Sequence, residues 1–276
     1  MGDARLADGR ITHGVIEHRA RLPYSLEEVE GAEHLLVALP AFVVDGSGAP
    51  PPDANLRRRL RNLRVHRLFL GSDPHFLIGP RNEWAGARTA TVLIRREAER
   101  LGVPLERVIV VGSSFRATMG LVIGLHAGVG HILAGAGPVH MGTWGKRLID
   151  KRADMPQVPM KKHGLGEKLL VDDPEQRRRL DALIPEAVAA ARHPCHLFLY
   201  VSPRDPFHPE MEGLHAALEG HPTITSTLEV HDYGTHKDVG PPFFRRVRQV
   251  LKPMVGTTRR SPEELAASAG RDGPEA

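Results

Sequence analysis

Short apolar runs alternate with longer amphipathic stretches along most of this chain. A short run of apolar, β-branched residues is typical of a strand covered on both faces, whereas apolar residues three and four apart are typical of a helix. The pattern predicts strands at residues 34–44, 65–70, 108–111, 131–134, 196–201 and 224–230, and two short edge strands within residues 10–21. It predicts helices at residues 56–63, 84–101, 117–125, 173–192, 210–218 and 243–251.

Strands that alternate with helices in this way predict a mainly parallel sheet with helices on both faces. In such sheets, active sites lie beyond the carboxyl ends of the strands. We expect one domain over residues 1–255 and a flexible, polar tail over residues 256–276. Residues 141–169 interrupt the alternation with seven lysines and arginines and two prolines. This segment is either a lid that contacts an anionic substrate or a solvated connection.

Composition narrows the class of protein. The 276 residues are 41% hydrophobic and 25% charged, which describes a soluble globular protein. The net charge of +4 comes without an arginine-rich arm, a zinc-ligand spacing or many aromatic residues, so we expect no nucleic-acid partner. The uncharged stretch at residues 117–139 contains several glycines and divides into a helix and a strand, so we expect no membrane span.

The first 22 residues are polar, which predicts no secretory signal and, with no disulfide, a cytoplasmic location. Cys195 is the only cysteine, and its place at the start of a predicted strand favours packing over reactivity. The run His193-Pro194-Cys195-His196 lacks the spacing and the carboxylate of a metal site. No phosphate-binding or dinucleotide-binding glycine loop is present, so we expect no cofactor.

A serine occupies the turn between the strand at residues 108–111 and the helix that follows it. In the pattern Gly-x-Ser-x-Gly, a nucleophilic serine projects from a sharp strand-to-helix turn, and small residues two positions away relieve crowding. Gly112-Ser113-Ser114-Phe115-Arg116 fits this pattern for Ser114, except that Arg116 replaces the second glycine. Ser113 fits worse, because Val111 and Phe115 would then take both crowded positions. An ordinary strand-to-helix turn is the alternative.

Two more residues are placed to work with Ser114. Asp205 follows the strand at residues 196–201, and His236 follows the last strand, so both are expected at the same sheet edge. A histidine with an unperturbed pKa of about 6.5 can take the serine proton, and a carboxylate can orient the imidazole. Asp238 and Asp232 are the other acids near His236, but Asp238 is too close in sequence and Asp232 lies at the strand end. For the oxyanion we expect the backbone N–H of Phe115 and that of Ala41 or Phe42.

The residues around this turn resemble a known bacterial family. Residues 112–118 and 131–144 are similar to the Gly-Ser-Ser-Lys-Gly-Gly-Thr and Gly-Ala-Pro-Gln-Tyr-x-x-Gly pattern of the accessory Sec system acetyltransferase-like proteins and related capsular polysaccharide biosynthesis proteins. Further similarity lies at residues 68–74, 200–206 and 233–239, and the resemblance extends diffusely over residues 35–251. The sequence differs at Phe115-Arg116-Ala117, where the family pattern has Lys-Gly-Gly.

The resemblance implies an α/β-hydrolase fold and a Ser-His-Asp triad, which corresponds to Ser114, His236 and Asp205. It also implies acyl transfer or deacylation on a carbohydrate or glycoconjugate, with protein partners in a cell-envelope pathway. The main hypothesis is therefore a serine-dependent acyl-ester hydrolase or acyltransferase. The alternative is a non-catalytic module of the same fold that binds a glycan or a partner, because Arg116 could block the cleft.

Overall fold

A computed structural model describes residues 10–39, 57, 59–60, 62–71, 84–154 and 171–257 of the chain. Its centre is an eight-stranded sheet with the order β1-β2-β4-β3-β5-β6-β7-β8. The strands are β1 (Arg10–Glu17), β2 (Arg21–Glu28), β3 (Leu35–Ala38), β4 (His66–Leu70), β5 (Val108–Ser113), β6 (His131–Gly135), β7 (Cys195–Val201) and β8 (Ile224–Val230).

Most neighbouring strands are parallel, as the alternating pattern predicts. The pairs β3–β4, β3–β5, β5–β6, β6–β7 and β7–β8 are parallel, and only β2 runs antiparallel to its neighbours β1 and β4 among the described strands. The prediction of two short edge strands within residues 10–21 is wrong. β1 is an edge strand, but β2 begins at Arg21 and lies inside the sheet, where its polar residue Glu27 is buried next to Arg67.

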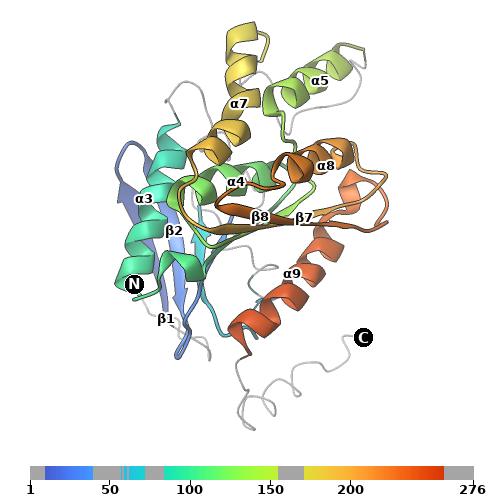
Figure 1. The fold of residues 1–276 in the computed structure, drawn as a ribbon. Coiled ribbons are helices and arrows are strands. Elements are labelled where there is room, and N and C mark those ends of the chain that lie inside the picture. The colour runs from blue at the N-terminus through green and yellow to red at the C-terminus, as the bar shows by residue number, and fades with distance from the viewer. Residues whose placement is uncertain are drawn as a thin grey trace, which may run out of the picture.

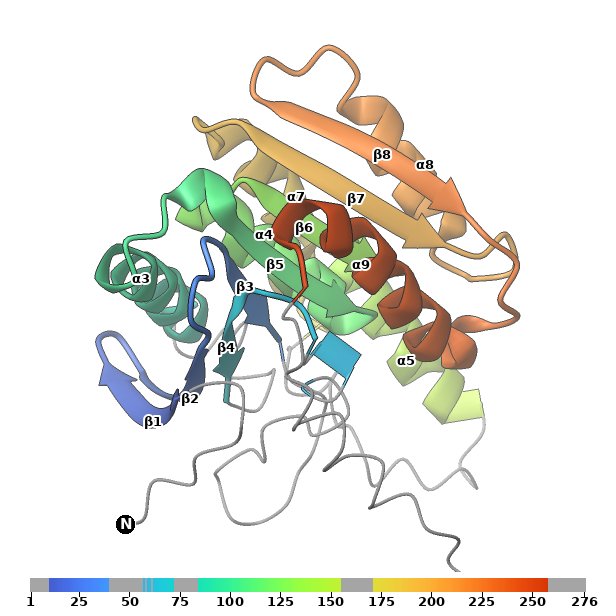
Figure 2. The same cartoon turned by 90° about the horizontal axis from the view of Figure 1, so that it is seen from below.

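Helices cover both faces of the sheet (Figures 1 and 2). α4 packs on one face between α3 and α7, while α9 crosses the opposite face, where the Phe243 ring lies directly over Gly135 of β6. The helices are α3 (Ala85–Arg100), α4 (Phe115–Ala127), α5 (Met141–Asp154), α7 (Pro174–Ala190), α8 (His208–Ala217) and α9 (Gly240–Val255), and two 3₁₀ turns are η2 (Leu105–Arg107) and η3 (His236–Asp238).

The core lies along β5 and α4. All six residues of β5 are buried, because helices cover both faces of the sheet there. α4 is buried on nearly every side, since α3 and α7 flank it and the sheet lies beneath it. These two elements meet at Ser114, so the turn lies between a fully buried strand and a largely buried helix.

Several sequence predictions fall on the described residues. The stretch at residues 117–139 divides between α4 and β6, and none of the helices in the described ranges has the length and apolar character to cross a bilayer. Cys195 is buried, and burial raises the pKa of its thiol to about 12, as expected for a packing residue. Residues 141–154 of the expected lid form α5, whereas residues 155–169 lie outside the described part of the chain.

Candidate active site

The Ser114 turn joins β5 to α4 with a sharp change of direction. Ser114 has φ 59° and ψ −138°, a region that L-residues seldom occupy, and α4 begins at the next residue. Its N–H donates to the Gly135 carbonyl of β6 at 2.6 Å, which ties the turn to the neighbouring strand. This conformation holds the serine at the carboxyl edge of the sheet, next to the first turn of α4.

Gly112 makes the sharp turn possible. A Cβ at this position would lie 2.4 Å from the carbonyl oxygen of Arg116, so only glycine fits without movement of the backbone. The group that crowds Gly112 is therefore the backbone of Arg116, and the Arg116 side chain is half-buried on the first turn of α4. The turn thus forms with arginine at the position where the usual pattern has its second glycine.

His236 reaches Ser114 from a turn after β8. The distance between Ser114 Oγ and His236 Nε2 is 2.7 Å. η3 begins at His236 and is fixed by Asp238, whose Oδ2 accepts hydrogen bonds from the Thr235 N–H at 3.0 Å and the Thr235 hydroxyl at 3.1 Å. Asp238 thus caps the turn that presents the histidine.

Asp205 lies on the other side of the imidazole. Its Oδ2 is 2.9 Å from His236 Nδ1, and its side chain is fully buried. Asp232 instead accepts from the Arg204 guanidinium at 3.0 Å and from the Gly234 N–H. Of the three acids weighed from the sequence, Asp205 is the one that contacts the imidazole.

These contacts fix the proton positions. An ionised carboxylate only accepts hydrogen bonds, so His236 Nδ1 carries the proton and donates to Asp205. The lone pair of Nε2 is then available to accept the hydroxyl proton of Ser114. The structure therefore brings together Ser114, His236 and Asp205 in one hydrogen-bonded chain.

Aromatic side chains extend the contacts of His236. The Phe207 ring packs edge-on against His236, with centroids 4.9 Å apart. The Trp144 ring of α5 has its centroid 6.1 Å from that of Phe207 and 6.3 Å from that of Phe115, so α5 packs next to the ring that contacts the histidine. Phe207 lies only two residues after Asp205 in the sequence, so its place near the site could have been predicted.

One expected oxyanion donor, Phe115, lies at the start of α4. Phe115 is the first residue of α4, so its N–H belongs to the N-terminal turn of the helix. The partial positive charge of a helix N-terminus also favours an anion at this point. Ala41 and Phe42, the expected second donors, lie outside the described residues.

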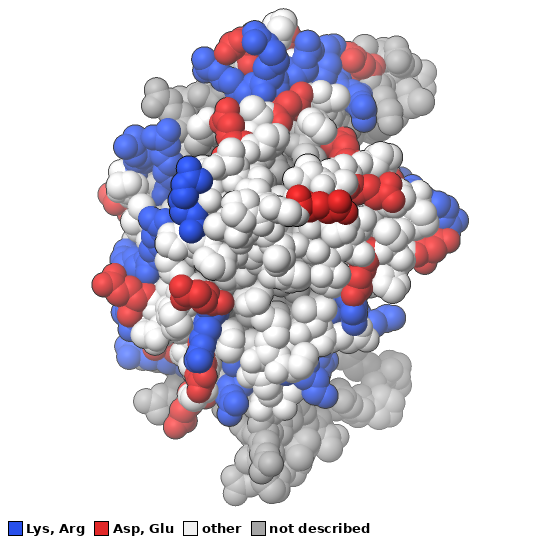
Figure 3. All heavy atoms as spheres, viewed as in Figure 1, with Lys and Arg blue, Asp and Glu red and all other residues white. Residues whose placement is uncertain are grey.

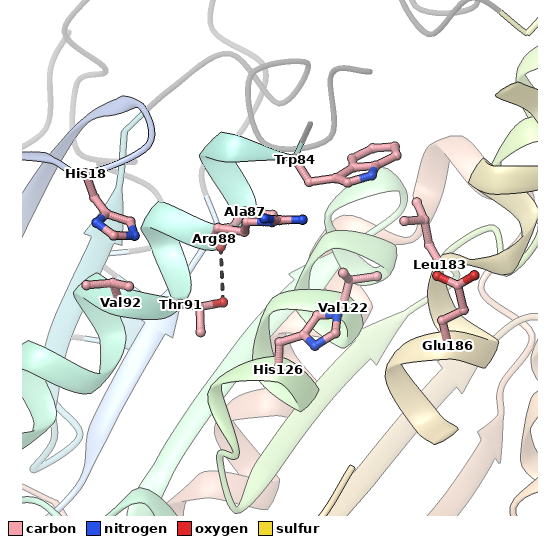
Figure 4. A pocket seen from close by; sticks show the side chains of 10 residues that line it. All are labelled: His18, Trp84, Ala87, Arg88, Thr91, Val92, Val122, His126, Leu183 and Glu186. Atoms are coloured by element: carbon pink, nitrogen blue, oxygen red, sulfur yellow. Dashed lines mark hydrogen bonds between the residues drawn. The ribbon is translucent and has the colours of Figure 1, made fainter. Parts of the chain in front are cut away.

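A separate groove of about 460 Å³ lies between α3, α4 and α7 (Figure 4). Trp84, Arg88, His126 and Glu186 lie around it, and none of Ser114, His236 or Asp205 lines it. The Thr91 hydroxyl on its wall donates to the Ala87 carbonyl at 3.1 Å. The Thr91 hydroxyl is thus bonded to its own helix, and no serine or cysteine is among the described residues that line the groove.

Charge is distributed unevenly over the surface. Figure 3 shows lysines and arginines gathered at the top, over α5 and the start of α7. Several of these cations have acidic partners: Arg178 and Arg179 pair with Glu175, and Lys146 pairs with Asp150. Within the described ranges, no three His, Cys, Asp or Glu side chains form a group suited to a metal ion.

Comparison with solved structures identifies the architecture. A chain of the "Glycosylation Associate Protein (Gap123) complex" from Streptococcus agalactiae is 14% identical with a TM-score of 0.66, over 90% of this chain and 48% of that one. An esterase from Pyrobaculum calidifontis is 14% identical with a TM-score of 0.61, over 94% of this chain and 84% of its own. This chain has the α/β-hydrolase fold.

A third structure with the α/β-hydrolase fold is the capsule O-acetyltransferase of Neisseria meningitidis serogroup A. It is 12% identical with a TM-score of 0.59, over 86% of this chain and 93% of the transferase. The fold class expected from the sequence is thus confirmed, and the similar structures include proteins of the kind that the motifs resemble. This chain spans about half the length of the Streptococcus protein. No protein-family model and no curated protein sequence matches it.

Proposed function

We propose that this protein is a serine-dependent acyl-ester hydrolase or acyltransferase with Ser114 as nucleophile. The observation that carries the proposal is the hydrogen-bonded chain from Ser114 through His236 to the buried Asp205 carboxylate. The esterases and the O-acetyltransferase among the similar structures support the same reaction class. At 12–14% identity those structures support the fold, and the side-chain geometry supports the chemistry.

In the first half-reaction, Ser114 Oγ attacks the acyl carbon while His236 Nε2 takes the hydroxyl proton. Asp205 stabilises the imidazolium that forms. The N–H of Phe115 donates to the developing oxyanion, and loss of one such donor typically costs about 2.7–4 kcal/mol. The ester C–O bond then breaks, and the leaving alcohol takes the proton from His236. The product of this step is an acyl-enzyme on Ser114.

In the second half-reaction, His236 takes a proton from water or from an acceptor hydroxyl, which attacks the acyl carbon. Ser114 leaves and regains its proton, which completes hydrolysis or transfer. The substrate that we propose is an O-acyl group on a carbohydrate. The motif resemblance and the capsule O-acetyltransferase among the similar structures support this substrate class. An acetylated sugar therefore belongs in the first assays, beside a general ester.

The test is turnover of p-nitrophenyl acetate and of an acetylated sugar by the wild type, Ser114→Ala and Ser113→Ala. Ser113 is the matched control, because it is the neighbouring hydroxyl but ends β5 as a buried residue. We expect Ser114→Ala to lose at least about 10³-fold in kcat, as for other nucleophile deletions, and Ser113→Ala to stay within about threefold of the wild type. A folded wild type that turns over neither ester would favour the binding module instead.

A further inference from the structure

Asp205 receives more hydrogen bonds than the proposed mechanism uses. Its Oδ2 accepts from His236 Nδ1 at 2.9 Å and also from the Tyr233 hydroxyl at 3.0 Å. Its Oδ1 accepts from the backbone N–H of Phe207 at 3.0 Å. The phenol and the imidazole therefore share one oxygen of a carboxylate whose side chain is fully buried.

The Tyr233 proton can point in only one useful direction. The Tyr233 hydroxyl lies 3.0 Å from Asp205 Oδ2, and an ionised carboxylate can only accept a hydrogen bond. The single phenol proton is therefore directed to Asp205. Burial, followed by the nearby Asp205 charge, raises the pKa of Tyr233 well above its usual value, so the phenol stays protonated.

The surroundings hold the phenol in this place. The Tyr233 ring stacks on the buried Tyr200 ring, with centroids 5.6 Å apart and planes 11° from parallel. The Ser202 hydroxyl donates to the Gly234 carbonyl at 2.9 Å, which links the loop after β7 to the loop after β8. Tyr233 therefore lies on the loop that presents His236, and its hydroxyl contacts Asp205, the residue that orients the imidazole.

We propose that Tyr233 is a positioning residue that fixes the Asp205 carboxylate and limits how strongly it attracts the proton on His236. The inference rests on the proposed function, because it gives a role beside that triad. A hydrogen bond from the phenol disperses negative charge on Oδ2, the oxygen that faces the imidazole. Without it, Oδ2 would stabilise the imidazolium more, and His236 would act as a base only at higher pH.

The test compares the wild type with Tyr233→Phe, which removes one oxygen and keeps the ring. The first readout is the NMR titration of the His236 imidazole in ¹³C-histidine-labelled protein, assigned with His236→Gln. We expect the midpoint to rise by about 0.5 pH units in Tyr233→Phe. In kinetics with p-nitrophenyl acetate, the acid limb of kcat/KM should move by the same amount. We also expect kcat to fall about three- to tenfold with KM within about twofold, because Tyr233 acts through Asp205.

Tyr200→Phe is the matched control, because it removes a phenol from the same stack without the contact to Asp205. It should leave the His236 midpoint and the acid limb unchanged. A midpoint in Tyr233→Phe equal to that of the wild type would overturn the proposal and leave Tyr233 a structural residue. The NMR titration does not require turnover. An inactive wild type would therefore contradict the proposed function, and the titration would still show whether Tyr233 affects His236.

Discussion

Ser114 occupies a backbone conformation that costs free energy. A positive φ at a residue other than glycine typically costs about 1–3 kcal/mol of free energy, and residues in this conformation cluster at functional sites. Here the cost is offset by the hydrogen bond from the Ser114 N–H to Gly135 at 2.6 Å and by one from the Ala117 N–H to the Ser114 carbonyl at 2.8 Å. The turn survives only while its close backbone contacts are undisturbed.

Gly112→Ala should therefore damage the site. The added Cβ would meet the Arg116 carbonyl oxygen at 2.4 Å, and the backbone would have to move. We expect a loss of about 1–3 kcal/mol in the free energy of unfolding, measured with urea, and a fall of at least tenfold in kcat/KM. Gly213→Ala in α8 is the control, because its new Cβ would meet nothing within 4 Å beyond its own chain neighbours and helix backbone. Wild-type kcat/KM in Gly112→Ala would contradict this role of the turn.

The sequence predicted that residues directly after a parallel strand would meet at one edge of the sheet. Ser114, Asp205 and His236 each follow a strand that ends at one sheet edge, so their proximity follows from topology. Tyr233 also follows β8, but nothing in the pattern marks its hydroxyl as a partner of Asp205, and Trp144 lies within α5. Their contacts depend on how a loop and α5 pack, which the apolar pattern does not encode.

At the scale of elements, β2 and β4 are joined by a buried ion pair. Arg67 has no exposed surface, and its Nη1 lies 3.1 Å from Glu27 Oε1. Its Nη2 donates to the carbonyls of Leu60 at 2.9 Å and Leu63 at 2.7 Å. One side chain therefore links two antiparallel strands to the segment before β4.

Arg67→Met should destabilise the protein strongly, because the buried Glu27 would lose its nearer cation and keep only Arg57, whose Nε lies 3.6 Å from Oε2. Removal of one partner of a buried pair typically costs about 3–5 kcal/mol, and we expect that range in urea unfolding. Arg107→Met is the control, since Arg107 pairs with Glu33 on the surface and should change stability by at most about 1 kcal/mol. Adding Glu27→Leu to Arg67→Met should recover part of the loss, and no recovery would contradict the explanation.

This pair also explains where the prediction of elements fell short. The interior parallel strands β3, β5 and β7 read as apolar runs because both of their faces are covered. β2 contains Ser25 and Glu27, which are polar yet buried, so its pattern does not resemble that of an interior strand. The boundary of α9, which extends from 240 to 255, was also missed at both ends, because prolines lie inside its first turn and near its end.

At the scale of the whole molecule, histidines line the amino edge of the sheet, opposite the candidate active site. His66 begins β4 and His131 begins β6, where it pairs in register with His196 of β7; His34 precedes β3. Burial lowers the pKa of all four, and for His131 the neighbouring His196 and His34 contribute as well. These imidazoles stay neutral in the fold at pH values where they would be charged in the unfolded chain.

Stability should therefore fall as the pH falls below about 6.5. In that range the unfolded chain binds more protons than the folded chain, so each unit by which the pH falls lowers the free energy of unfolding. The decline ends when the histidines of the folded chain also become protonated. Urea midpoints at about pH 7.5, 6.5 and 5.5 would measure the decline. His131→Gln should reduce it, whereas His18→Gln, at an exposed position, should not. A midpoint that is constant over this range would contradict the assignment of neutral buried histidines.

The claim that Ser114 is an activated nucleophile is tested most directly by covalent labelling. Purified wild type, Ser114→Ala and His236→Ala would be treated with a fluorophosphonate probe and examined by intact-mass and peptide mass spectrometry. We predict a single adduct on Ser114 in the wild type and none in either variant, because the hydroxyl reacts only when His236 takes its proton. A folded wild type that carries no adduct, or carries it on Ser113, would contradict the account.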